Sequence, residues 1–98
     1  MNGKQRAYLR SMCNTIPAII LVGKEGITDT LTHSVEEALE ARELIKMGVQ
    51  RCAPMTAREA CTELCERTGA EPVQCIGNKF CIYKPREENP EIILPKEL

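Results

Sequence analysis

Hydrophobic and polar residues alternate with two different periods along the chain, and each period predicts a different kind of element. Apolar residues spaced three and four apart predict three helices, at residues 2–14, 27–41 and 56–68. Continuous or alternating apolar runs predict four short strands, at residues 18–22, 43–49, 72–76 and 80–84. The expected order is α-β-α-β-α-β-β. Strands separated by helices pair in parallel and the terminal hairpin is antiparallel, so we expect an α/β fold with a mixed four-stranded sheet.

Local sequence signals mark several of these boundaries. Thr28 is a suitable N-cap for the second helix, and Thr56 with Glu59 has the Ser/Thr-x-x-Glu pattern of a capping box. Gly69 is suited to end the third helix, because glycine readily takes the left-handed conformation found there. The strand at 18–22 is apolar at every position, so we expect both of its faces to be covered.

A segment bracketed by two glycines, residues 23–26, joins the first strand to the second helix. Gly23 and Gly26 have no Cβ, so the backbone there can adopt a positive φ and approach a ligand closely. Lys24 adds a positive charge, and the N-terminus of the following helix offers unpaired N–H groups and a favourable dipole. These features are typical of an anion site, although an ordinary strand-to-helix turn also uses glycine. Gly-x-x-Gly clamps RNA backbone in KH modules, but a loop between strand and helix does not have the KH topology.

Length and composition limit the possible classes of protein. The 98 residues fit one domain at 1–85, followed by a proline-containing tail at 86–98 that we expect to be extended. Hydrophobic residues make up 43% and charged residues 28%, which is typical of a globular chain. No apolar run approaches the ~20 residues of a membrane span, and the N-terminus is polar, so we expect a cytosolic location and no membrane partner.

Charge is distributed unevenly, although the net charge is only −1. Residues 1–24 contain four bases and no acid, whereas residues 27–41 contain four acids and no base. Such segregation can create a basic face, which Lys46, Lys79 and Lys84 would extend if they lie on the same side. The aromatic residues available for base stacking are Tyr8, Phe80 and Tyr83. So few rings favour binding that is directed to the nucleic-acid backbone and weakly specific for sequence.

Catalytic and metal-binding patterns are weak in this sequence. The single histidine, His33, lies in the acidic helix and is expected at the surface, and no nucleophile–base set is legible. The six cysteines are expected to be reduced and mostly on apolar faces; they are Cys13, Cys52, Cys61, Cys65, Cys75 and Cys81. A small thiol- or metal-dependent protein using these cysteines remains an alternative, as does an interaction adaptor using the acidic helix. No cofactor is expected.

Four motifs in order resemble the YhbY-like single-domain bacterial proteins of the CRM-domain family. They lie at residues 3–10, 22–28, 37–46 and 73–77, and the resemblance extends over residues 2–86. It implies a non-catalytic RNA-binding module that contacts ribosomal RNA or pre-ribosomal particles during large-subunit maturation. It also implies a fold similar to the C-terminal domain of translation initiation factor three, and no small-molecule substrate.

The resemblance also implies which residues contact RNA. The family's RNA-contacting loop corresponds to Gly23, Lys24, Glu25 and Gly26, and its basic first helix to Lys4, Arg6 and Arg10. The candidate set further includes Arg42 and Lys46. The cysteines depart from the family pattern, especially at positions 13, 52, 61 and 65, and this departure leaves a redox role open.

Overall fold

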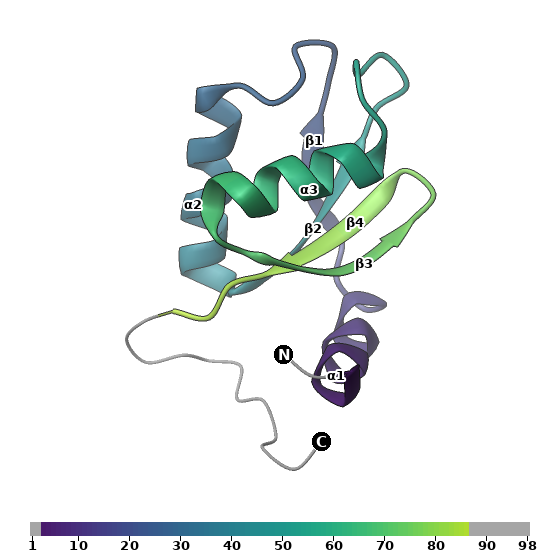
Figure 1. Ribbon diagram of the computed structural model, residues 1–98, viewed down its shortest axis with the longest axis vertical. Coiled ribbons are helices and arrows are strands. Elements are labelled where there is room, and N and C mark those ends of the chain that lie inside the picture. The colour runs from purple at the N-terminus through teal and green to yellow at the C-terminus, as the bar shows by residue number, and fades with distance from the viewer. Residues whose placement is uncertain (1–2, 87–98) are drawn as a thin grey trace.

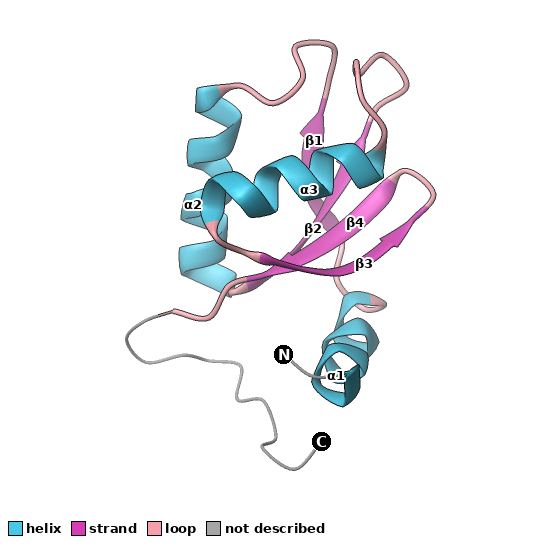
Figure 2. Cartoon of the chain, viewed as in Figure 1, coloured by secondary structure: helices cyan, strands magenta, loops and turns pink. Residues whose placement is uncertain are grey.

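The computed structural model describes residues 3–86, which form three helices and four strands (Figure 1; Figure 2). The helices are α1 (Gly3–Cys13), α2 (Asp29–Arg42) and α3 (Ala57–Thr68). The strands are β1 (Ala18–Val22), β2 (Leu44–Val49), β3 (Glu71–Ile76) and β4 (Lys79–Tyr83). The predicted order of elements is confirmed. The tail predicted at 86–98 lies outside the described residues from position 87 onward.

The four strands form one mixed sheet in the spatial order β1-β2-β4-β3. β1 and β2, which α2 connects, pair in parallel, as expected for strands that a helix separates. β4 pairs antiparallel with β2 on one side and with β3 on the other. The terminal hairpin therefore inserts its second strand beside β2, and β1 and β3 become the edges of the sheet.

Helices cover the sheet on both faces. Successive residues of a strand point to opposite faces, so Ile45 and Met47 of β2 lie on one side and Leu44 on the other. Ile45 and Met47 belong to a core cluster with residues of α2 and α3, which therefore cover one face. Leu44 belongs to a second cluster with Leu9 and Cys13 of α1, which lies on the opposite face (Figure 1).

Capping residues set the limits of α2 and α3. Thr28 Oγ1 accepts a hydrogen bond from Leu31 N over 3.0 Å, so α2 begins at Asp29, two residues later than predicted. Thr56 and Glu59 form the predicted capping box, with Thr56 N donating to Glu59 Oε1 over 2.9 Å and Glu59 N donating to Thr56 Oγ1 over 3.2 Å. Gly69 ends α3 with φ of 80°, as its lack of a Cβ allows.

Glu43 differs from its predicted place in the second strand. It is the C-cap of α2, with φ of 65°, and its N–H donates to Leu39 O over 2.8 Å. The side chain is fully buried, and its Oε2 accepts a hydrogen bond from Arg86 N over 2.9 Å. β2 consequently begins one residue later, at Leu44. A hydrogen bond of this kind offsets part of the cost of burying a carboxylate.

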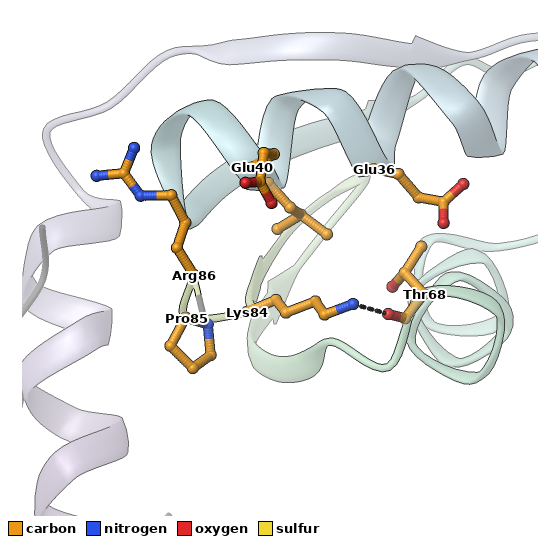
Figure 3. A pocket seen from close by; sticks show the side chains of 7 residues that line it. Glu36, Glu40, Thr68, Lys84, Pro85 and Arg86 are labelled. Atoms are coloured by element: carbon orange, nitrogen blue, oxygen red, sulfur yellow. Dashed lines mark hydrogen bonds between the residues drawn. The ribbon is translucent and has the colours of Figure 1, made fainter. Parts of the chain in front are cut away.

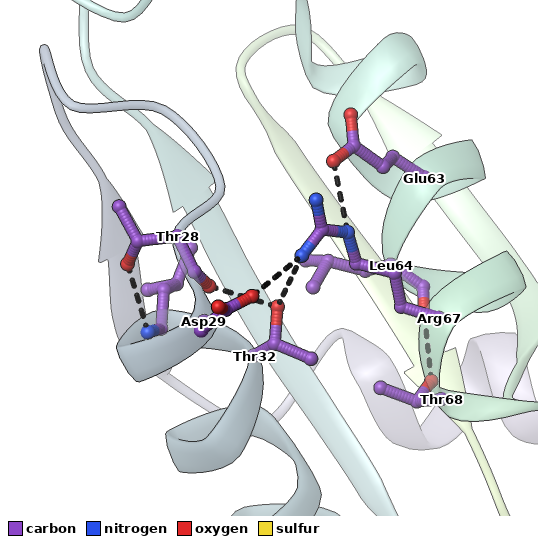
Figure 4. A network of polar contacts seen from close by, with 8 residues as sticks. Thr28, Asp29, Thr32, Glu63, Leu64, Arg67 and Thr68 are labelled. Atoms are coloured by element: carbon purple, nitrogen blue, oxygen red, sulfur yellow. Dashed lines mark hydrogen bonds and ion pairs between the residues drawn. The ribbon is translucent and has the colours of Figure 1, made fainter.

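A polar network joins α2 to α3 on the side away from α1 (Figure 4). Arg67 Nη1 lies 3.5 Å from Asp29 Oδ1 and 3.4 Å from Thr32 Oγ1. Its Nε lies 3.0 Å from Glu63 Oε2, one turn earlier on α3. Arg67 therefore holds the first turn of α2 against α3. The N-cap of α2, Thr28, comes shortly after the glycine-bracketed segment at residues 23–26.

β1 is not covered on both faces, contrary to the prediction. Val22 is buried and Ile20 packs on the core between the sheet and α2–α3. On the other face, Ile19 and Leu21 remain 37% and 53% exposed. The reason is that α1 packs against the far half of this face, around Leu44, and leaves the half near the C-terminal end of β1 open.

Candidate nucleic-acid interface

The segment at residues 23–26 forms a single exposed turn. Gly26 N donates a hydrogen bond to Gly23 O over 3.0 Å, and Gly26 has a φ of 72°. Lys24 and Glu25 occupy the two corners of this turn and are exposed, whereas Gly26 is buried beneath them. Of the two glycines that could adopt a positive φ, Gly26 does so and Gly23 does not, and the turn presents the lysine side chain to solvent.

Gly26 packs tightly against the segment that follows β2, whereas Gly23 lies near the end of the Gln50 side chain. A Cβ at Gly26 would lie 3.2 Å from Pro54 Cγ and 3.3 Å from Met55 Cε, and one at Gly23 would lie 3.0 Å from Gln50 Oε1. These are close approaches for carbon, so the neighbouring side chains would have to move. The positive φ and the tight packing of Gly26 thus account for that glycine without a ligand, whereas at Gly23 the Gln50 side chain can move aside, and a binding role has to rest on charge and exposure.

The N-terminus of α2 contributes less positive potential to the turn than the sequence suggests. α2 starts at Asp29 rather than at residue 27, and Thr28 already accepts the hydrogen bond of Leu31 N. The carboxylate of Asp29 lies in the first helical turn, where it interacts favourably with the helix dipole. Lys24 is therefore the main positive group within the turn itself.

Three connections meet at the end of the sheet that carries this turn: those from β1 to α2, from β2 to α3 and from β3 to β4. Gln50 N, just after β2, donates to Val22 O over 2.9 Å, because the C-terminal ends of the parallel strands β1 and β2 lie side by side. Val49 N donates to Asn78 O over 2.8 Å, which brings the β3–β4 turn to the same end. Arg51 is exposed next to Gln50, and the sequence analysis missed it as a candidate. The predicted parallel pairing of the first two strands could have identified it, because parallel strands place the residues that follow them side by side.

The cations of α1 lie at the other end of the sheet. Leu9 and Cys13 pack on Leu44 and Tyr83, which are far along their strands from the turn. On this helix Lys4 and Arg10 are exposed, and Arg6 is half-buried. The predicted loop and the predicted basic helix therefore do not form one compact site.

Two lysines of the sheet lie between these ends. Lys46 pairs with Cys81 across β2 and β4, and Cys81 belongs to the cluster under α1, so Lys46 is on the α1 face. Lys79 is two residues from Cys81 along β4 and lies on the same face. We call the α1 cations, Lys46, Lys79 and Lys24 the basic strip, because they follow one another from α1 to the turn.

Of the two other predicted cations, Lys84 lies elsewhere and Arg42 lies next to the basic strip. Lys84 is not on this side, because its Nζ donates to Thr68 O over 2.7 Å at the end of α3 (Figure 3). There it lines a cavity of about 330 Å³ together with Glu36, Glu40 and Arg86. This cavity has mixed charge and is separate from the basic strip. Arg42 is exposed in the last turn of α2 and lines a groove together with Lys46 of the basic strip and Met12 of α1.

Two of the three aromatic rings cannot stack on bases from outside. Phe80 and Tyr83 are only 1% and 4% exposed, and burial is the main reason that the pKa of Tyr83 is raised. Tyr8, on α1, is 39% exposed. The expectation that all three rings are available was wrong, because β4 is a central strand with helices on both faces.

The six cysteines are free thiols. Cys13, Cys61 and Cys81 are buried, whereas Cys52 is exposed in the loop after β2 and so departs from the predicted apolar setting. The pKa of Cys81 is raised mainly by a hydrogen bond with Cys13 and secondly by burial of the thiol. A hydrogen bond with Cys61 does the same for Cys65. Within the described part of the chain, no three His, Cys, Asp or Glu side chains group as a metal site would require.

His33 lies on the exposed side of α2, as predicted, with its Nε2 3.3 Å from Glu37 Oε1. Among residues 3–86, no helix has the length and apolar character needed to cross a bilayer.

The fold and its basic strip thus define a small α/β module with a cationic face. Residues 1–84 match the model of the CRS1 / YhbY (CRM) domain, so the chain belongs to this family. The family implied by the four sequence motifs is therefore confirmed.

Similar proteins support the same assignment. "Probable RNA-binding protein YqeI" of Bacillus subtilis is 38% identical over 95 residues, which cover 97% of this chain and 99% of that protein. An "RNA-binding protein" of Haemophilus influenzae is 29% identical over 97 residues, covering 99% and 97% of the two chains. The solution structure of SAV1595 from Staphylococcus aureus, described there as a candidate RNA-binding protein, matches with a TM-score of 0.80 and 40% identity. That match covers 97% of this chain and 99% of the other.

Proposed function

We propose that this protein binds RNA without catalysing a reaction, and that the Gly23–Gly26 turn contacts the RNA backbone. The observation that carries the proposal is the turn itself: one backbone hydrogen bond presents the exposed Lys24 at the end of β1, an edge strand of a CRM-domain sheet. A lysine on an exposed turn can approach a phosphate without displacing other protein groups. The names of the relatives point to the same ligand.

The remaining cations extend this contact along the molecule. Lys79 and Lys46 lie between the turn and α1, and Arg51 lies beside the turn. Because these groups are spread along one side from α1 to the turn, they fit a strand or helix of nucleic acid better than a small anion. Binding led by phosphates supplies affinity and orientation but little sequence specificity.

The target that fits best is ribosomal RNA or a pre-ribosomal particle, bound in the cytosol during maturation of the large subunit. This part of the proposal rests on the family resemblance. RNA crosslinked to the protein in cells and then sequenced would test it: enrichment of large-subunit rRNA is expected, and enrichment of unrelated messenger RNA would contradict it.

A salt titration tests phosphate-led binding itself. If three to five phosphates are neutralised, the logarithm of the association constant should fall with the logarithm of salt concentration with a slope of about −2 to −5. The measurement uses a structured RNA fragment and the full chain. A slope near zero would contradict contact through the basic strip.

A further inference from the structure

The face of the sheet that carries α1 is open over the half next to the Gly23–Gly26 turn. Four residues from the four strands lie in one row across this half, in the order Leu21, Gly48, Lys79 and Ile76. Leu21 is 53% exposed and Ile76 is 65% exposed, so both ends of the row are accessible apolar side chains. Gly48 between them has no side chain, and a Cβ there would lie 2.8 Å from Leu21 Cδ2. Leu21 therefore leans over Gly48, and Lys79 Nζ also lies 3.8 Å from where that Cβ would be, so the row is a platform of two accessible apolar side chains with one ammonium group between them.

A groove of about 230 Å³ lies beside this platform, toward the end of α1. Its lining includes Asn14, Lys46, Gln74, Ile76, Lys79 and Cys81. Two residues with carboxamides and two lysines thus line the groove with Ile76 and the almost fully buried Cys81, and no acidic residue lines it. Asn14 follows α1 directly and is exposed, and Gln74 lies on the edge strand β3, half-buried.

This combination of groups matches an unstacked nucleobase. A base is a flat ring with apolar faces, and its edges carry adjacent donors and acceptors, which a carboxamide can pair because it both donates and accepts. Recognition of RNA sequence usually relies on such splayed bases from single-stranded segments. The two lysines complement the charge of the phosphates that accompany the base, which argues against a cationic or apolar peptide as the occupant.

The groove is also continuous with the phosphate contact proposed above. Leu21 lies on β1, two residues before Gly23 of the turn. The groove reaches β3, which is three strand spacings from β1 across the sheet. With ~4.8 Å between strands, the groove lies on the order of 15 Å from the turn, a distance that a few nucleotides can span. Lys79 lies on the route between them.

We propose that this groove holds one unstacked base of the RNA strand whose phosphates contact the Gly23–Gly26 turn, and that Gln74 and Asn14 read its edge. The inference rests on the proposed function, and it adds base preference to a surface that otherwise binds backbone. Gln74 and Asn14 are specificity-determining residues in this view, whereas Lys24 supplies affinity.

The test compares dissociation constants for single-stranded oligo-A, oligo-C, oligo-G and oligo-U of equal length. The parent chain is expected to prefer one base, and Gln74→Leu, which keeps the volume and removes the amide, is expected to reduce that preference about 2- to 10-fold. Its salt slope should stay unchanged. Ile76→Glu provides a second variant at an exposed position, and Ser34→Asp, on the exposed side of α2, provides a matched control for added negative charge.

The outcomes separate the two proposals. Equal affinity of the parent for all four oligomers, or an unchanged preference in Gln74→Leu, would overturn the groove assignment while leaving the turn intact. If Lys24→Asp binds as the parent does while Gln74→Leu loses base preference, the turn assignment fails, and the groove holds a base of a strand that is not anchored at the turn. If Ile76→Glu and Ser34→Asp behave alike, the platform does not touch RNA. A second protein chain on this face, detected as dimerisation that Ile76→Glu abolishes without RNA, would also contradict the inference.

Discussion

The amide N–H of Gly26 donates a hydrogen bond to the carbonyl of Gly23 over 3.0 Å, and this contact determines how Lys24 is presented. The bond closes a tight turn whose buried side faces Pro54 and whose exposed corners carry Lys24 and Glu25. Gly26 therefore serves the conformation and packing of the turn, and the lysine supplies its charge. Substitutions can test these two roles separately.

Substitution of Gly26 should cost stability because of its positive φ and because of its close neighbours. Gly77 is a control that has the positive φ but no close neighbours. Both glycines have positive φ, 72° and 60°, so an alanine at either is strained by about 1 kcal/mol or more. A Cβ at Gly26 also meets Pro54 and Met55, whereas none is met within 4 Å at Gly77. Urea unfolding should show a larger loss for Gly26→Ala than for Gly77→Ala. Equal losses would mean that the loop after β2 moves aside without cost.

The cysteines should contribute to stability according to their burial. Cys13→Ala, Cys61→Ala and Cys65→Ala each remove a packed thiol and should cost on the order of 1 kcal/mol of unfolding free energy. Cys52→Ala, at an exposed position, should cost close to nothing. RNA affinity of the folded variants should stay within a few-fold of the parent.

The thiol assignment has its own test. Titration of the unfolded chain should find six free thiols, and a metal assay should find no zinc. A large loss of RNA affinity in a fully folded cysteine variant, or bound zinc, would instead favour the thiol- or metal-dependent alternative.

The capping box of α3 should make stability depend on acid. Thr56 N–H and the Thr56 side chain hydrogen-bond to Glu59, and this lowers the pKa of its carboxyl from the usual 4.5. Because the folded pKa lies below the unfolded one, the stabilisation is complete above pH 4.5 and is lost as the pH falls through the folded pKa. Unfolding measured from pH 7 to pH 3 should show the stability gap between the parent and Glu59→Gln closing over this acidic range. A gap that stays constant with pH would contradict this role of the carboxylate.

Much of the fold can be predicted from the sequence because its signals are local. The capping box at Thr56 and the left-handed glycine at position 69 require only neighbouring residues, and both are confirmed. Glu43 could not be predicted as a C-cap, because positive φ is uncommon for residues other than glycine and is maintained here by contacts with residues 84–86. The exposure of Leu21 depends on where α1 packs on the sheet, and an all-apolar strand gives no sign of that.

The candidate site was predicted only in part for the same reason. The turn at 23–26 is a contiguous segment, so its residues are visible in the sequence. The separation of this turn from α1, the burial of Phe80 and the arrival of Arg51 at the turn's edge all depend on how the strands are ordered. The periodicity of the sequence does not contain that order.

The most direct test of the central claim is the RNA affinity of Lys24→Asp, measured together with its thermal midpoint. The variant reverses one exposed charge beside Glu25 and leaves both glycines in place, so the midpoint should match that of the parent. Lost attraction and added repulsion should together weaken binding to structured RNA by about 1–3 kcal/mol at low salt. Ser34→Asp, which adds a carboxylate on α2 away from the turn, should bind with nearly the parent's affinity. If Lys24→Asp is folded and binds RNA as tightly as the parent, the turn does not contact phosphate and the account is wrong.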